Sequence, residues 1–273
     1  MAGRARNKTK IRTHKIDDYI NTNNVSKEIV EELRNSLNGD SSDLKRIAKD
    51  VIKNLPRLKC KNTKQKEFYR LLEEKDVVAC QGVAGTGKTH LSVYCALKTL
   101  LNPDNKIERI ILTKPAQQLA TENLGFIKGS IEEKVLPIME SYQGIFEDII
   151  GIAAHNTLVE KGIIVYKPMA FLRGTTMKNS YIIFDEVQMA SLHATRTLMQ
   201  RMGEDSKLNL LGDRKQTEIK NRKNNPLSLL INKFELIDEF GTFEFTIDDI
   251  IRNKLIIIFE KIFEEIENDL SNK

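Results

Sequence analysis

The stretch VVACQGVAGTGKTHLSVY, residues 77–94, decides the fold of this chain. The chain has only 14 glycines in 273 residues, yet three of them lie within six positions here, and the last is followed by Lys-Thr. Residues 82–89, GVAGTGKT, match G-x-x-x-x-G-K-[ST], the pattern of a phosphate-binding loop (P-loop). Glycine lets the backbone curl around an anion and point its N–H groups inward, where a side chain would collide. The apolar run before the loop and the helical pattern after it supply the strand and the helix that such a loop joins.

The P-loop predicts which residues contact a nucleotide. Lys88 is expected to reach the β- and γ-phosphates and to act in catalysis, and the Thr89 hydroxyl is expected to ligate Mg²⁺. The helix that starts near Lys88 adds the positive end of its dipole. His90 is expected at the edge of the nucleotide pocket. The predicted nucleotide contacts within this stretch are Gly82, Val83, Ala84, Gly85, Thr86, Gly87, Lys88, Thr89 and His90.

A pair of acidic residues supplies the second half of the predicted site. Residues 181–188 read YIIFDEVQ, an apolar run that ends in Asp185 and Glu186. A P-loop needs a carboxylate at the end of a neighbouring strand to hold the metal, and Asp185 is expected to do so directly or through water. Glu186 is expected to orient and polarise the attacking water, which favours a hydrolase over a kinase. The alternative is that the two acids simply end a strand in solvent.

The rhythm of apolar runs predicts an α/β fold. Short runs rich in β-branched residues start near residues 77, 109, 162, 181 and 208, with helical patterns between most of them. Continuous apolar strands suit a mostly parallel sheet covered by helices on both faces. Near the end of the chain an amphipathic helix is expected, with its apolar side at Leu255, Ile258, Phe259, Ile262 and Ile266.

The first part of the chain has a different character. Residues 1–15 carry six Lys or Arg and no acid, and they are interpreted as a solvated arm or, alternatively, as an arm that contacts nucleic acid. Residues 16–56 contain two helical patterns, of which the second has apolar positions at Leu44, Ile47, Val51 and Leu55. The predicted domains are therefore 1–56, a basic tail with a short helical appendage, and 57–273, the P-loop domain.

Composition limits the remaining possibilities. The chain is 40% hydrophobic and 30% charged with a net charge of +5, which is typical of a globular protein with a mildly basic surface. No apolar run approaches the roughly eighteen residues that a membrane span needs. The three cysteines are odd in number and lack metal-ligand spacing, so they are interpreted as reduced thiols of a cytoplasmic protein. His155 and His193 have no partner pattern and are expected at the surface.

Two glutamines narrow the class of P-loop protein. Gln188 follows the acidic pair by two residues, and LNLLGDRKQ, residues 208–216, places Gln216 beyond the next strand. A glutamine there can hydrogen-bond the γ-phosphate or the water and report hydrolysis to the rest of the protein; the alternative is an ordinary polar loop. Asp-Glu-x-Gln followed by Gly-Asp-x-x-Gln resembles the RecA-like motor cores of helicases.

The intervening segments make the resemblance more specific. LTKPAQQLATENLGFIKGSIEEKVLPIMESY, KPMAFLRGTT, FDEVQ, LLGDRKQ and FTIDDIIRNKLI come in the order and at the spacing of the PhoH-like ATPases. The match covers about residues 60–260. It implies a single RecA-like nucleotide-hydrolysing core that is related to superfamily-one helicases and often forms rings.

The resemblance also implies roles for residues outside the P-loop. Gln65 resembles the glutamine that reads adenine, and Arg252 resembles the arginine that completes an ATP site, expected here to be that of the next subunit in a ring. The alternative for Arg252 is a surface salt bridge to Asp248 or Asp249 on its own helix. Two positions depart from the family pattern: Lys114 and Thr175 stand where arginine is usual, and neither offers a planar bidentate donor.

The expected function is Mg²⁺-dependent ATP binding and hydrolysis, coupled to binding or remodelling single-stranded RNA or DNA. The catalytic residues expected are Lys88, Glu186, Gln216 and Arg252, with Thr89 and Asp185 at the metal. A homo-oligomer, by resemblance a hexameric ring, is the expected assembly. The alternative function is a nucleotide-switched ring-assembly protein that does not translocate. A P-loop kinase is disfavoured by the acidic pair.

Overall fold

The computed structural model describes residues 41–115, 131–167, 169–172, 174–213 and 225–271. The chain divides into two compact units, Met1–Asp43 and Leu44–Lys273. Nearly all described residues belong to the second unit. No helix within the described ranges is both long and apolar enough to cross a membrane.

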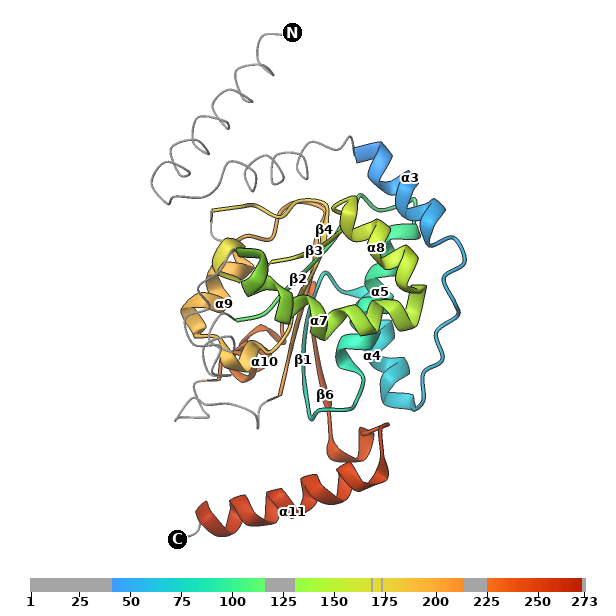
Figure 1. Cartoon of the computed structure of the whole chain (residues 1–273). Coiled ribbons are helices and arrows are strands. Elements are labelled where there is room, and N and C mark those ends of the chain that lie inside the picture. Colours follow the sequence, from blue (N-terminus) through green and yellow to red (C-terminus); the bar gives the residue numbers. More distant parts are fainter. Residues whose placement is uncertain (1–40, 116–130, 168, 173, 214–224, 272–273) are drawn as a thin grey trace. The chain divides into compact units, whose positions relative to one another are not determined.

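The second unit is built on a parallel sheet of six strands in the order β3-β2-β4-β5-β1-β6 (Figure 1). Every strand pairing is parallel. The five predicted apolar runs are all strands, and the sheet gains a sixth strand, β6, that the pattern does not predict. The strands are β1 Val77–Gly82, β2 Arg109–Thr113, β3 Ile164–Tyr166, β4 Ser180–Phe184, β5 Lys207–Gly212 and β6 Phe240–Phe245.

Helices cover both faces of the sheet. The described helices are α3 Ser41–Val51, α4 Thr63–Glu74, α5 Lys88–Leu101, α7 Ile131–Ile150, α8 Ile152–Glu160, α9 Leu192–Met199, α10 Pro226–Phe234 and α11 Lys254–Ser271. Successive residues of a strand point to opposite faces, so Val78 joins the core cluster on the side of α4, α5, α7 and α8, whereas Ala79 joins the cluster on the side of α9 and α10. This two-sided burial explains why the strand sequences are continuously apolar.

The strand order identifies the fold. β5 lies between β1, which leads into the P-loop, and β4, which ends in the acidic pair. An inserted strand at this place is the arrangement of RecA-like P-loop domains, so the predicted fold class is confirmed. The expectation that the acidic pair ends a strand next to β1 is wrong, because β4 is the second strand along from β1.

The second predicted helix is part of the P-loop domain's core. From Leu44 onward α3 buries Leu44 and Ala48, and Ile52 follows just after it, all in the cluster that contains α5 and α8. The connection to α4 is tied down, because the Tyr94 hydroxyl donates to the carbonyl of Pro56 at 2.8 Å. The compact unit therefore begins at Leu44, ahead of the domain boundary predicted at residue 57.

The amphipathic helix predicted near the end of the chain is α11, and it packs differently from the others. None of its residues belongs to either core cluster of the described chain. Many of its apolar side chains are about half exposed: Leu255, Ile258, Phe259, Ile262, Phe263 and Ile266, at 47–61%. Figure 1 shows α11 beyond the end of β6.

Candidate nucleotide-binding and active site

The P-loop joins β1 to α5 and has the backbone shape that its glycines permit. Gly85 and Gly87 have φ angles of 84° and 90°, in the left-handed region that other residues avoid. Gly87 is the N-cap of α5, so the loop leads directly into the N-terminal end of that helix. The fully buried Thr86 fixes the curve by donating its hydroxyl to the carbonyl of Val83 at 3.1 Å. The loop is thus preorganised for an anion at the helix N-terminus.

Lys88 lies across the loop. Its ammonium donates to the carbonyls of Gly82 and Val83 at 2.6 and 2.9 Å. An ammonium group has three N–H donors, so one remains for a ligand. The predicted contact with a nucleotide phosphate is consistent with this position.

Thr89 and Asp185 meet although they come from different elements. The Thr89 hydroxyl, on the first turn of α5, donates to Asp185 Oδ2 at 3.0 Å. Asp185 is 8% exposed, and its Oδ1 accepts the backbone N–H of Glu186 at 3.0 Å. The contact forms across the intervening β5 because the carboxyl ends of parallel strands lie at one edge of the sheet.

These two side chains fit a Mg²⁺ ion. A hydroxyl and a carboxylate are hard oxygen ligands, and Mg²⁺ in nucleotide sites takes few protein ligands and fills its octahedron with phosphate oxygens and water. The described residues contain no group of three or more His, Cys, Asp or Glu side chains that could hold a metal ion.

Glu186 is held in an unusual conformation. Its backbone has φ 57° and ψ 37°, the left-handed region, at the start of the 3₁₀ turn Val187–Met189. Such backbone outliers cost energy and gather at functional sites. Partial burial, followed by the charge of Asp185, raises the pKa of the Glu186 carboxyl, while a hydrogen bond from Gln188 and the charges of Lys114 and Lys88 oppose the rise.

Gln188 is fully buried and connects Glu186 to the end of β5. Its Nε2 donates to Glu186 Oε2 at 2.6 Å, and its Oε1 accepts the backbone N–H of Asp213 at 3.0 Å. Gly212 and Asp213 line the same pocket as Glu186. Gln216, the predicted catalytic glutamine of this loop, lies outside the described residues.

Gln65 braces the P-loop. The side chain is 3% exposed, its Nε2 donates to the carbonyl of Thr86 at 2.8 Å, and its Oε1 accepts the N–H of Lys61 at 2.8 Å. Both ends of the amide are thus engaged by the chain itself. Gln65 lines the pocket, and adenine reading by this residue stays a prediction.

Arg252 lies in the pocket of its own chain. A methyl group placed on Gly85 would lie 3.3 Å from Arg252 Cδ, and the preceding Ile251 donates its N–H to the carbonyl of Gly85 at 3.1 Å. The alternative salt bridge is not seen among the described residues, because Asp248 pairs with Lys261 and Asp249 accepts from Thr246. Completion of a neighbouring subunit's site by Arg252 stays a prediction.

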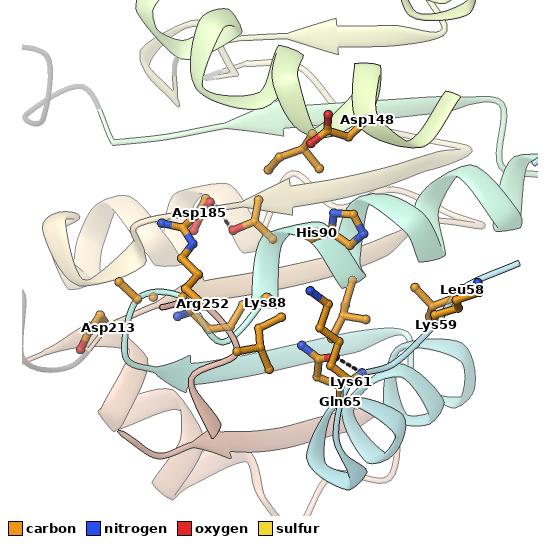
Figure 2. Close-up of a pocket in the computed structure, with 18 of the residues that line it drawn as sticks. Leu58, Lys59, Lys61, Gln65, Lys88, His90, Asp148, Asp185, Asp213 and Arg252 are labelled. Carbon is orange, nitrogen blue, oxygen red and sulfur yellow. Dashed lines mark hydrogen bonds between the residues drawn. The ribbon is translucent and has the colours of Figure 1, made fainter. Parts of the chain in front are cut away.

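The pocket around the P-loop has a volume of about 570 Å³ (Figure 2), within the range of small-molecule sites. Other lining residues come from segments that no motif predicts: Leu58, Lys59, Lys61, Leu91, Ile145 and Asp148. Figure 2 shows His90 between Asp148 and Lys61. Burial lowers the pKa of His90, while the nearby Asp148 opposes that shift. The structure thus brings together all predicted site residues within its described ranges except Gly82, Val83 and Thr86, whose atoms shape the loop behind the pocket.

Solved structures similar to this chain include the large terminase from a thermophilic bacteriophage. Its ADP complex aligns with a TM-score of 0.39 and 12% identity, and covers 71% of this chain and 48% of that one. Another crystal form gives a TM-score of 0.42 and 13% identity, with the same coverage. These scores are low, and the fold assignment rests on the strand order and the P-loop.

Sequence relatives are closer. A PhoH-like protein of Bacillus subtilis is 33% identical over 199 residues, 73% of this chain and 61% of the relative. Protein PhoH of Escherichia coli K12 is 29% identical over 197 residues, 71% of this chain and 55% of the relative. The chain thus spans little more than half the length of these curated relatives. Residues 57–264 match the family described as PhoH-like protein, and the chain belongs to that family.

Proposed function

We propose that this protein binds ATP together with Mg²⁺ and hydrolyses it to ADP and phosphate. The observation that carries the proposal is the 3.0 Å contact between the Thr89 hydroxyl and the Asp185 carboxylate at the P-loop, with Glu186 next in the chain. A kinase would need an acceptor substrate in place of the water that Glu186 can polarise.

Each residue has a defined task in this proposal. Lys88 and the P-loop N–H groups hold the β- and γ-phosphates, and Glu186 accepts a hydrogen bond from the attacking water. As the new O–P bond forms, the bond from the γ-phosphorus to the bridging oxygen breaks, ADP leaves, and the water's proton passes towards Glu186. Bound Mg²⁺ supplies neutralisation of the phosphate charge. Arg252, in the pocket of its own chain, adds a positive charge near the phosphates.

Replacing Glu186 by glutamine tests the proposed chemistry. Glu186→Gln should bind ATP with near-normal affinity but release phosphate about 10²-fold or more slowly, because an amide cannot polarise the water. The measurements are phosphate release and equilibrium nucleotide binding. Glu160→Gln, at an exposed side chain at the end of α8, is the matched control. Wild-type turnover in Glu186→Gln would show that another residue polarises the attacking water.

Coupling of hydrolysis to single-stranded nucleic acid is the second part of the proposal. It is supported by the helicase-like order of motifs and by the net charge of +5. Oligonucleotides of RNA or DNA should raise the rate of phosphate release, and their binding should weaken as salt rises, since Lys and Arg contacts release counterions. If neither RNA nor DNA oligonucleotides change the rate of phosphate release at low salt, the nucleotide-switched assembly function is favoured instead.

A further inference from the structure

Gln188 makes two contacts that join separate parts of the active site. Its side-chain N–H donates to Glu186 Oε2 at 2.6 Å, and its side-chain oxygen accepts the Asp213 N–H at 3.0 Å. Glu186 follows β4, whereas Asp213 follows β5. One buried amide therefore spans the gap between the neighbouring strands at the edge where the pocket lies.

The orientation of the Gln188 amide follows from its partners. The oxygen and nitrogen of such an amide are assigned from the hydrogen-bond network. Here a carboxylate oxygen requires a donor, and a backbone N–H requires an acceptor, so only one orientation satisfies both. A flip would place oxygen against Glu186 and N–H against Asp213.

The chain leaves room for Gln188 at Gly212. A methyl group on Gly212 would overlap Gln188 Oε1 and would lie 3.0 Å from Leu227 Cδ2. Leu227 is a fully buried core residue on α10, so the neighbouring wall has little freedom to move. Any side chain at 212 would displace the Gln188 amide.

The turn that carries both residues is itself fixed. The Met189 N–H donates to the Glu186 carbonyl at 2.9 Å, and the Ala190 N–H donates to that of Val187 at 3.0 Å. Gln188 and Val187 are both fully buried. The backbone of this turn is therefore fixed, and the remaining freedom is rotation of the Glu186 side chain. The hydrogen bond from Gln188 limits that rotation.

We propose that Gln188 is a positioning residue that holds Glu186 in its working orientation and ties that orientation to the backbone at Gly212–Asp213. This rests on the proposed ATP hydrolysis. The hydrogen bond occupies one carboxylate oxygen of Glu186 and turns the other towards the water. A change in the backbone position of Asp213 would therefore change the position of the Gln188 amide and with it that of Glu186.

The first test separates catalysis from binding. Gln188→Ala should lower kcat for ATP hydrolysis about 10- to 100-fold while leaving the Kd for ATP within about twofold, because it removes no contact to the nucleotide. The matched control is Gln143→Ala, which removes a similar bond, from Gln143 Nε2 to Glu147 Oε1 at 2.7 Å, on α7 outside the pocket. The control should keep wild-type kcat.

A second variant guards against loss of folding. If Gln188→Ala no longer unfolds cooperatively or no longer binds ATP, Gln188→Met decides, since it keeps most of the length and volume of the side chain and adds no charge beside Glu186, but has no N–H to donate to it. Gln188→Met should also lose kcat with the Kd for ATP retained. Wild-type kcat in a folded Gln188 variant overturns the proposal.

Double-mutant cycles test the path of the effect. Gly212→Ala should lower kcat about 10-fold in the wild type and have a smaller effect in Gln188→Ala, where the amide that the methyl group would overlap is absent and only the contact with Leu227 remains. Gln188→Ala should add nothing to Glu186→Gln. Additive effects in either cycle overturn the proposal. If Glu186→Gln keeps full turnover, the role of Glu186 in the proposed hydrolysis is wrong. If Glu186→Gln is slow but Gln188→Ala has wild-type kcat, the proposed hydrolysis stands and only the role of Gln188 is wrong.

Discussion

At the scale of residues, two buried glutamines brace the site from opposite sides. Gln65 joins the Lys61 N–H to the Thr86 carbonyl, and Gln188 joins the Asp213 N–H to the Glu186 carboxylate. A primary amide carries a donor and an acceptor on one rigid group. Glutamate or lysine at either position satisfies only one partner, which leaves a buried polar group unpaired.

A buried histidine gives stability a dependence on pH. His155, expected at the surface, is 2% exposed on α8, and its Nε2 lies 2.9 Å from the Tyr166 hydroxyl. Burial lowers the pKa of His155, while the side chain of Asn156 and the charge of Glu147 oppose the shift. The unfolded chain, with an ordinary histidine pKa of about 6.5, therefore binds the proton first as the pH falls.

The resulting prediction concerns unfolding temperature. The stabilisation from neutral His155 is complete above the unfolded pKa and is lost as the pH falls through and below it. His155→Gln should lose less stability than the wild type between about pH 7.5 and pH 5.5, measured by thermal unfolding. His193→Gln, at an exposed position of α9, should behave like the wild type. Parallel pH curves for wild type and His155→Gln would contradict the prediction.

Prediction from sequence works here where function depends on local order along the chain. Lys88 and Thr89 follow the glycines directly, so the P-loop pattern names them, and the acidic pair ends an apolar run. The contacts of Gln65 with Thr86 and of Gln188 with Asp213 join residues 21 and 25 positions apart, and no spacing rule announces them. Asp148 is another such case, since only the packing of α7 brings it to the pocket.

At the scale of elements, α3 and α11 have similar amphipathic patterns and opposite packing. Leu44 on α3 is 6% exposed in the main core, whereas Leu255 on α11 is 52% exposed. Periodicity predicts that a helix has an apolar side, but the position of that side depends on where the chain folds back. The predicted appendage and the predicted final helix therefore could not be told apart by pattern alone.

This contrast predicts that the same substitution, leucine to alanine, has different effects on the free energy of unfolding in α3 and in α11. Leu44→Ala should lower the free energy of unfolding by about 2–5 kcal/mol, because it removes buried apolar contacts and leaves a cavity. Leu255→Ala should change it by about 0.5 kcal/mol or less. Denaturant unfolding at low protein concentration measures both. Equal losses would show that α11 is packed in solution or that α3 is not.

At the scale of the whole molecule, the P-loop and the acidic pair Asp185-Glu186 of one chain line a single pocket. Family resemblance supports a homo-oligomeric ring, which remains a proposal. In such a ring an arginine can complete the site of its neighbour, yet Arg252 lies against its own Gly85. Light scattering with and without ATP measures the assembly directly.

A mixing experiment shows whether Arg252 acts in the site of its own chain or in that of a neighbouring subunit. Arg252→Ala and Glu186→Gln should each reduce ATP hydrolysis. Because Arg252 and Glu186 line the pocket of one chain, we expect a mixture to show only the sum of the residual activities. Subunit exchange has to be verified with labelled protein. Recovery of activity in mixed assemblies would show that Arg252 serves the neighbouring subunit.

The close approach of Gln188 to Gly212 also bears on how this family can diverge. The most severe overlap of a side chain at 212 is with the amide of Gln188, and its contact with Leu227 Cδ2, at 3.0 Å, is milder. In relatives that keep glutamine at 188, selection should remove residues other than glycine at 212. In relatives with a small residue at 188, we expect alanine or serine to be tolerated at 212. The two positions should therefore covary across relatives, with loss of the glutamine preceding loss of the glycine in any ancestral reconstruction.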